Sequence, residues 1–163
     1  MTRIHLCTGL LRRADDVLLV RCTYEGEPEP LWVLPGGRQE RDETIVDALV
    51  REFKEETSLA VTPGPLAYVS ESVDRRRGLH VVNCTFHMRE VDPAATPRSA
   101  DPRVVDVRFT PPAQALELLA ADVLRIPVGA ALGAEPHPRY FSFDDHEVAV
   151  PFFGRSRASS GAQ

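Results

Sequence analysis

The sequence predicts an α/β fold in which two helices pack against a mixed β-sheet. Five or six segments typical of strands lie on both sides of a segment with the spacing of an amphipathic helix, so strands and helices alternate along the chain. The chain has 163 residues, a length that suits one domain with a single hydrophobic core. We therefore predict one domain over residues 1–153 and a disordered tail over residues 154–163.

The first strands are predicted from β-rich segments near the N-terminus. Residues 4–11 and 17–24 are such segments, and the polar stretch Arg-Arg-Ala-Asp-Asp between them predicts a hairpin. The acidic, proline-containing loop over residues 25–30 is interpreted as a solvated connection. Residues 31–34 then form a short strand that leads into Pro-Gly-Gly at residues 35–37.

A helix is predicted from Thr44 onward, where apolar residues change from alternation to helical spacing. Its apolar stripe consists of Ile45, Ala48, Leu49 and Phe53. Asp42, Glu43 and Thr44 supply the acidic and capping residues expected where a helix begins.

Three more strands are predicted in the second half of the chain. The Pro-Gly-Pro stretch at residues 63–65 is expected to break the chain before them. Residues 66–73 and 79–91 are strands, joined by a turn that ends at Gly78. After a proline-rich loop, residues 104–109 form the last predicted strand.

A second helix is predicted after this strand, with Thr110 as its cap and Pro111 at its first position. It carries the apolar residues Leu116, Leu119 and Val123. The aromatic residues within 125–153 are expected to pack on the domain or on a partner subunit.

Composition argues against several classes of protein. Hydrophobic residues make up 43% and charged residues 26%, as in ordinary soluble domains, and the apolar runs are too short to cross a bilayer. The net charge of −5 offers no general attraction to nucleic acid. No signal peptide is recognised, so we predict a cytoplasmic protein without a membrane or nucleic-acid partner. The three cysteines stand apart and are interpreted as core residues.

The first predicted helix carries an acidic face. Glu52, Glu55 and Glu56 span an arc of about 100° and share one face of the helix. Glu52 and Glu56 are a like-charged pair one turn apart, which is unfavourable unless something compensates for the repulsion. A hard divalent cation such as Mg²⁺ or Mn²⁺ would do so, because it prefers carboxylate oxygens. An ordinary acidic helix end is the alternative interpretation.

The spacing from Gly37 to Leu59 resembles the Nudix box. That motif is Gly, five residues, Glu, seven residues, and then Arg-Glu-hydrophobic-any-Glu-Glu-any-Gly-hydrophobic. The matching residues here are Gly37, Glu43, Arg51, Glu52, Phe53, Glu55, Glu56 and Leu59. The one departure is Ser58 in place of Gly, at a position just past the helix where a positive φ is easy only for Gly.

The resemblance implies a Nudix-type α/β/α sandwich with a mixed sheet, and it implies a divalent metal site. Glu52, Glu55 and Glu56 would bind Mg²⁺ or Mn²⁺, with the carbonyl of Gly36 as a further ligand. Glu52 and Glu55 would also take part in catalysis. Arg51 would pair with Glu43 and hold the loop and helix in register.

In this family the general base is either a box glutamate or an acid from a downstream loop, and the sequence leaves both alternatives open. Asp101, in the loop before the strand that starts at residue 104, is the candidate from that loop. Arg103 stands where relatives that act on ADP-ribose carry an acid, which argues against transferring their mechanism directly.

The implied activity is metal-dependent hydrolysis of the diphosphate linkage in a nucleoside diphosphate joined to another moiety, such as ADP-ribose. A nucleoside triphosphate pyrophosphohydrolase, a nucleotide sensor that does not cleave its ligand, and an isomerase are the alternatives. The Pro or Tyr that marks some subfamilies just beyond the box is absent from residues 74–77. A homodimer is also open, since dimers are common in the family.

Overall fold

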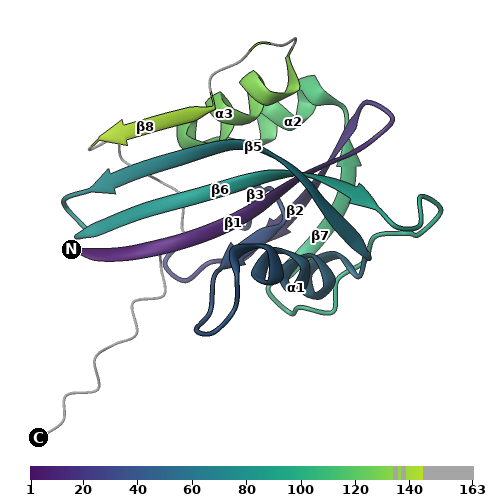
Figure 1. Cartoon of the computed structure of the whole chain (residues 1–163), viewed down its shortest axis with the longest axis horizontal. Coiled ribbons are helices and arrows are strands. Elements are labelled where there is room, and N and C mark those ends of the chain that lie inside the picture. The colour runs from purple at the N-terminus through teal and green to yellow at the C-terminus, as the bar shows by residue number, and fades with distance from the viewer. Residues whose placement is uncertain (134–135, 137–138, 145–163) are drawn as a thin grey trace, which may run out of the picture.

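The computed structural model describes residues 1–133, 136 and 139–144 (Figure 1). In chain order its elements are β1 (Thr2–Arg13), β2 (Asp16–Cys22), β3 (Leu31–Val33), β4 (Gly36–Arg38), α1 (Ile45–Thr57), β5 (Val61–Asp74), β6 (Leu79–Glu90), β7 (Val104–Thr110), α2 (Pro112–Leu118), α3 (Asp122–Leu132) and β8 (Tyr140–Asp144). Within the described residues, each helix is too short or too polar to span a membrane. The predicted tail at residues 154–163 lies outside the described residues.

The strands form one mixed sheet in the order β3-β2-β1-β6-β5-β8, with β4 paired to β1 and β7 paired to β2. β1 runs parallel to β6 and antiparallel to β2 and β4. α1 covers one face of the sheet, whereas α2 and α3 cover the other (Figure 1). This arrangement confirms the predicted α/β/α sandwich with a mixed sheet.

β1 is buried on both faces, since helices cover both sides of the sheet. Successive side chains of a strand point in opposite directions, so alternate residues of β1 pack against different helices. Cys7 and Leu11 pack in a cluster with Ala48, Leu49 and Phe53 of α1. Leu6 and Leu10 belong to a second cluster, which includes Ala115, Leu119 and Val128 from the helical side opposite α1. A fully buried leucine contributes roughly 1.5–3 kcal/mol relative to an exposed one, so the two clusters bind both helical layers to the sheet.

Both predicted hairpins are present. β1 and β2 meet through Arg12↔Val17 and Arg13↔Asp16. β5 and β6 pair along almost their whole length, and Gly78 adopts a φ of 65° in the turn between them. A positive φ costs Gly nothing sterically, which explains its place at the end of this turn.

The second predicted helix is wrong in two respects. α2 begins at Pro112 with Pro111 as its N-cap, and no side chain caps it, because Thr110 is still part of β7 and pairs with Val17. Val123 lies in a separate helix, since the chain leaves the helical conformation at Leu119. No Gly or Pro marks this break in the sequence, so a prediction from apolar spacing alone continues the helix across it.

Two segments that the sequence does not predict as strands lie within strands. Gly36–Arg38 forms β4, which pairs with the middle of β1. The Pro-Gly-Pro stretch at residues 63–65 lies inside β5, where the pairing with β6 shifts register. Proline removes a donor from the ladder and favours such an irregularity, but the neighbouring residues continue the strand. β8, which the sequence does not predict, adds a parallel strand beside β5.

α1 begins with the cap that the sequence predicts. The Thr44 hydroxyl accepts a hydrogen bond from the Asp47 N–H at 3.1 Å, and the Asp47 carboxylate accepts one from the Thr44 N–H at 3.3 Å. Substituting Thr44 by Ala is expected to lower the free energy of unfolding by about 1 kcal/mol, because one helix N–H loses its acceptor. Urea unfolding followed by circular dichroism measures this loss. Thr44→Ser keeps the hydroxyl, and an equal loss in both variants would contradict the capping role.

Candidate active site

Gly36 and Gly37 of β4 lie against β1 and α1, and both glycines make close contacts. Gly36 has a φ of 145°, and a Cβ there would lie 2.1 Å from the backbone oxygen of Cys7. A Cβ on Gly37 would lie 2.5 Å from Oε1 of Glu52. No side chain fits at Gly36, and one at Gly37 would displace the Glu52 carboxylate, so the backbone of this segment approaches the acidic face of α1 directly.

Glu56 and Glu52 are buried beside these two glycines, with relative exposures of 6% and 8%. The N–H of Gly36 donates a hydrogen bond of 2.9 Å to Oε2 of Glu56. Burial raises the pKa of Glu56 to about 8, opposed by this hydrogen bond and reinforced by the charge of Glu52. Burial also raises the pKa of Glu52, against the lowering effect of Arg51. Both carboxylates therefore resist ionisation unless a positive charge reaches them.

Arg51 links the loop to the helix. Its Nε and Nη2 donate to the two carboxylate oxygens of Glu43 at 3.1 and 2.7 Å, which is the ion pair that the resemblance implies. Its Nη1 donates to Glu52 at 2.9 Å, and its Nη2 also donates to the carbonyl of Arg38 at 3.2 Å. One guanidinium thus fixes the loop, β4 and one of the buried glutamates relative to each other.

Glu55 is placed differently from the other two box glutamates. Its side chain is 48% exposed, and one oxygen lies 3.5 Å from Nη1 of Arg51. The structure therefore brings Glu52 and Glu56 to Gly36 and Gly37 of β4 and leaves Glu55 more exposed, beside Arg51.

The loop that carries Asp101 is docked on the C-terminal end of α1. The N–H of Arg98 donates to the Thr57 carbonyl at 2.9 Å, and the Ser99 hydroxyl donates to the Glu55 carbonyl at 3.3 Å. Asp101, whose side chain is 9% exposed, accepts a hydrogen bond of 2.6 Å from Nη2 of Arg103. The predicted candidate base thus lies next to the acidic face, but it is paired with a guanidinium.

Arg103 also belongs to this site. The sequence identifies it only as a residue that stands where relatives acting on ADP-ribose carry an acid. Its guanidinium lies near enough to Glu52 and Glu56 to favour their charged forms, and the pKa of Arg103 is raised, chiefly by its hydrogen bonds to Asp101. The only sign of this ion pair in the sequence is that Asp101 and Arg103 are two residues apart.

The donor set suits a hard divalent cation, although no three His, Cys, Asp or Glu side chains of the described residues gather as a ready metal cluster. The fit rests on Glu52 and Glu56, whose buried carboxylates both lie against Gly36 and Gly37 of β4. Oxygen donors are those that Mg²⁺ and Mn²⁺ prefer. A bound cation would also remove the electrostatic cost that raises both pKa values.

Ser58 ends α1 in the left-handed conformation that the Nudix glycine would adopt. Its φ is 56° and ψ is 11°, and its N–H donates to the Lys54 carbonyl at 3.1 Å. Ser58→Gly is therefore expected to raise the free energy of unfolding by up to about 1 kcal/mol, because glycine occupies this region without strain. Urea unfolding checks this, with Ser58→Ala as the control that keeps a Cβ. An unchanged or lowered stability of Ser58→Gly would contradict the strain.

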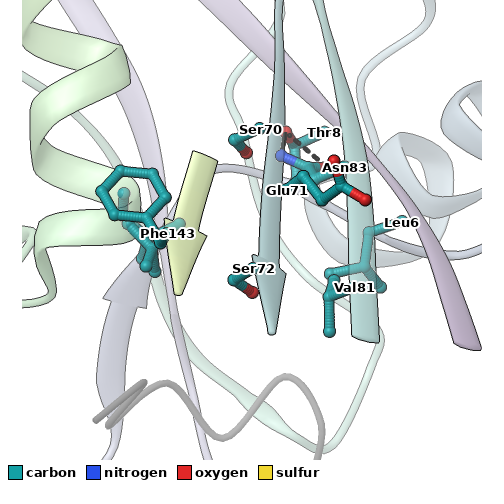
Figure 2. Close-up of a pocket in the computed structure, with 10 residues that line it drawn as sticks. Leu6, Thr8, Ser70, Glu71, Ser72, Val81, Asn83 and Phe143 are labelled. Carbon is teal, nitrogen blue, oxygen red and sulfur yellow. Dashed lines mark hydrogen bonds between the residues drawn. The ribbon is translucent and has the colours of Figure 1, made fainter. Parts of the chain in front are cut away.

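A shallow hollow lies between the sheet and α3 (Figure 2). Its lining residues come from β1, β5, β6, α3 and β8, and they are Leu6, Thr8, Ser70, Glu71, Ser72, Val81, Asn83, Val123, Leu124 and Phe143. Sequence reasoning misses this hollow. Its signal is faint, because polar residues at alternate strand positions, such as Ser70 and Ser72, ordinarily indicate a solvated face.

A family model described as NUDIX domain matches residues 3–130, which is more than half of the chain. Over 61 residues the chain is 46% identical to an 8-oxo-dGDP phosphatase from Homo sapiens, a match that covers 37% of this chain and 19% of that protein. It is 35% identical over 79 residues to an ADP-ribose pyrophosphatase from Methanocaldococcus jannaschii, covering 48% of this chain and 46% of that protein. The matched segment is thus less than half the length of either relative.

Solved structures share the fold at low sequence identity. A MutT protein from Bacillus halodurans aligns with a TM-score of 0.68 and 22% identity, covering 86% of this chain and 89% of that chain. At this identity the likeness concerns the fold alone.

Proposed function

The chain belongs to the Nudix family, and from that premise we propose that it hydrolyses the diphosphate linkage of a nucleoside diphosphate joined to another moiety, using Mg²⁺ or Mn²⁺. The observation that carries the proposal is the pair of buried glutamates, Glu52 and Glu56, held against Gly36 and Gly37 of β4. Family membership also makes a divalent metal the expected cofactor. A cytoplasmic location is part of the proposal.

The proposed metal ligands are Glu52, Glu55, Glu56 and the carbonyl of Gly36. When bound, divalent cations would neutralise the diphosphate and lower the pKa of water for attack on phosphorus. Gly36 orients Glu56 through its N–H, and Arg51 orients Glu52. The rotation of Glu55 away from Arg51 would complete the oxygen donor set.

Proton transfer needs a base within reach of the attacking water. Asp101 is the proposed base from the downstream loop, and Glu52 or Glu55 from the box is the alternative. Asp101 would act as a base more readily when Arg103 turns away from its carboxylate, since the guanidinium now donates to both Asp101 oxygens. A substrate phosphate is the natural competing partner for that guanidinium.

The substrate class is supported by the relatives as well as by the metal site. An ADP-ribose pyrophosphatase is among the proteins that the chain resembles, which favours a nucleoside diphosphate derivative. Resemblance to an 8-oxo-dGDP phosphatase favours the second candidate, an enzyme that acts on free nucleotides, such as a nucleoside triphosphate pyrophosphohydrolase.

The test is a panel of ADP-ribose, NADH, dinucleoside polyphosphates, nucleotide sugars, coenzyme A and nucleoside triphosphates, each with Mg²⁺ or Mn²⁺ and with chromatographic identification of the products. The proposal expects a nucleoside monophosphate and a phosphorylated remainder from a linked substrate. Release of pyrophosphate from triphosphates alone would favour the second candidate. Nucleotide binding without turnover of any member would overturn hydrolysis and favour a sensor.

A further inference from the structure

The C-terminal end of α1 is closed by hydrogen bonds from the loop that joins β6 to β7, residues 91–103. The last carbonyl groups of a helix have no partner within the helix and need donors from elsewhere. The N–H of Leu59, which would continue the helical pattern to Glu55, donates instead to the Thr57 hydroxyl at 3.2 Å. The Glu55 carbonyl accepts its hydrogen bond from the loop, from the hydroxyl of Ser99 at 3.3 Å.

The same hydroxyl accepts a hydrogen bond from the backbone of the proposed base. The N–H of Asp101 donates to Oγ of Ser99 at 3.0 Å. A serine hydroxyl has one proton and two lone pairs, so it can donate to the helix and accept from Asp101 at the same time. One side chain thus joins the helix that carries the box glutamates to the residue proposed to take a proton.

The chain on either side of this contact is held separately. Before it, the N–H of Arg98 donates to the last carbonyl of α1 at 2.9 Å, and after it, the N–H of Thr23 donates to the Arg103 carbonyl at 2.8 Å. These backbone hydrogen bonds keep the loop on the domain without help from Ser99. The Ser99 hydroxyl has a narrower effect, because it connects Asp101 itself to α1.

Proton transfer depends steeply on the position of the base. In the proposed reaction Asp101 takes a proton from the attacking water, the water oxygen bonds to phosphorus, and the bridging oxygen leaves with the electron pair of the broken bond. A misplacement of about 1 Å can lower a rate on the order of 10²-fold. The Asp101 carboxylate is attached to the Cα whose N–H donates to Ser99, so a shift of this segment moves the carboxylate as well.

We propose that Ser99 is a positioning residue of the active site, whose hydroxyl holds Asp101 at the distance from α1 that proton transfer requires. The inference rests on the proposed function, because it concerns the base of the same hydrolysis. Ser99 then affects the rate through Asp101 and leaves metal and substrate binding unchanged, since its hydroxyl donates to the backbone of Glu55 rather than to a carboxylate.

The test is steady-state kinetics of the full chain and its variants on ADP-ribose, or on the panel member that is hydrolysed fastest, at saturating Mg²⁺. Ser99→Ala is expected to lower kcat about 10-fold and to change KM by less than about twofold. Ser99→Thr keeps the hydroxyl and should retain kcat within about threefold, and Ser99→Cys, a weaker donor, should fall between the two. Thr96→Ala, which removes an exposed hydroxyl of the same loop, is the matched control and should keep kcat.

A double-mutant cycle shows whether Ser99 acts through Asp101. Asp101→Asn keeps the N–H that donates to Ser99 but removes the base, and it is expected to lower kcat about 10²-fold or more. Adding Ser99→Ala to this variant should lower kcat by less than about a further twofold, because no base is left to position. A purely structural role of Ser99 would give the same loss in both backgrounds. Calorimetric titration of Mn²⁺ into Ser99→Ala should give an affinity within about twofold of that of the unsubstituted chain.

The outcomes separate this inference from the proposed function. If the unsubstituted chain hydrolyses a panel member, then an unchanged kcat in a folded Ser99→Ala variant, additive losses in the cycle, or weakened Mn²⁺ binding would overturn the inference alone. An unchanged kcat in Asp101→Asn would do the same, because a box glutamate would then be the base. Far-ultraviolet circular dichroism checks folding, and the Thr and Cys variants carry the comparison if Ser99→Ala does not fold. If no panel member is hydrolysed, the proposed function fails and this inference fails with it.

Discussion

Replacing Glu56 by Gln is expected to lower kcat on the order of 10²–10³-fold while the protein stays folded. Glu56 is buried, and its raised pKa shows that its surroundings already favour an uncharged group at this position. Glutamine keeps the shape and an oxygen that can accept the Gly36 N–H, so folding should tolerate it. What it loses is the negative charge that the proposed metal requires. Glu55→Gln is expected to lower kcat in the same direction, because Glu55 is a proposed ligand as well.

Turnover of the best panel substrate, measured at saturating Mg²⁺ or Mn²⁺, checks this expectation. Glu117→Gln is the matched control, since Glu117 is an exposed glutamate of α2 on the other side of the sheet. Calorimetric titration of Mn²⁺ into the Glu56→Gln variant should show weakened binding. Unchanged rates in both Glu55→Gln and Glu56→Gln would remove the box glutamates from catalysis.

Replacing Gly36 by Ala is expected to lower the free energy of unfolding by about 3 kcal/mol or more. Two effects add at this position. A φ of 145° is unfavourable for any residue with a Cβ, and the Cβ would lie 2.1 Å from the backbone oxygen of Cys7. Because backbone cannot move aside as a flexible side chain can, β4 would have to separate from β1. Urea unfolding followed by circular dichroism measures the loss.

Gly78→Ala separates the two effects. Gly78 also has a positive φ, of 65°, but nothing lies within 4 Å of its added Cβ. Its substitution should cost only about 1 kcal/mol, the price of the backbone conformation alone. Equal losses for the two glycines would show that the close approach of Cys7 to Gly36 is unimportant.

The acidic face of α1 was predictable because helix geometry is local. The spacing of Glu52, Glu55 and Glu56 places them on one face whatever surrounds the helix, and the Thr44 cap likewise depends on neighbours in sequence. Glu52 and Glu56 are buried with the apolar residues Ala48, Leu49 and Phe53 of the same helix. Local rules failed at Leu119, where the chain leaves the helix without a Gly or Pro to mark it.

The surroundings of the glutamates depend on contacts between distant parts of the chain. The pairing of Thr8 with Gly36 and the docking of Arg98 on Thr57 join segments that no spacing rule relates. The ion pair between Asp101 and Arg103 is local, but its position beside α1 follows from that docking. Their roles in catalysis stay predictions.

The sequence by itself determined the helix, its carboxylates and the family, because these depend on periodicity and on the order of residue types. Only the tertiary structure decided that Glu55 is more exposed than Glu52 and Glu56, that the Asp101–Arg103 ion pair lies beside α1, and that Ser70, Ser72 and Asn83 line a hollow. The physical reason is that burial and hydrogen-bond partners arise from strand pairing across the sheet. The alternation of apolar and polar residues along a strand can be read from the sequence. Tertiary packing decides which face of the strand a helix covers and where the helix leaves that face uncovered.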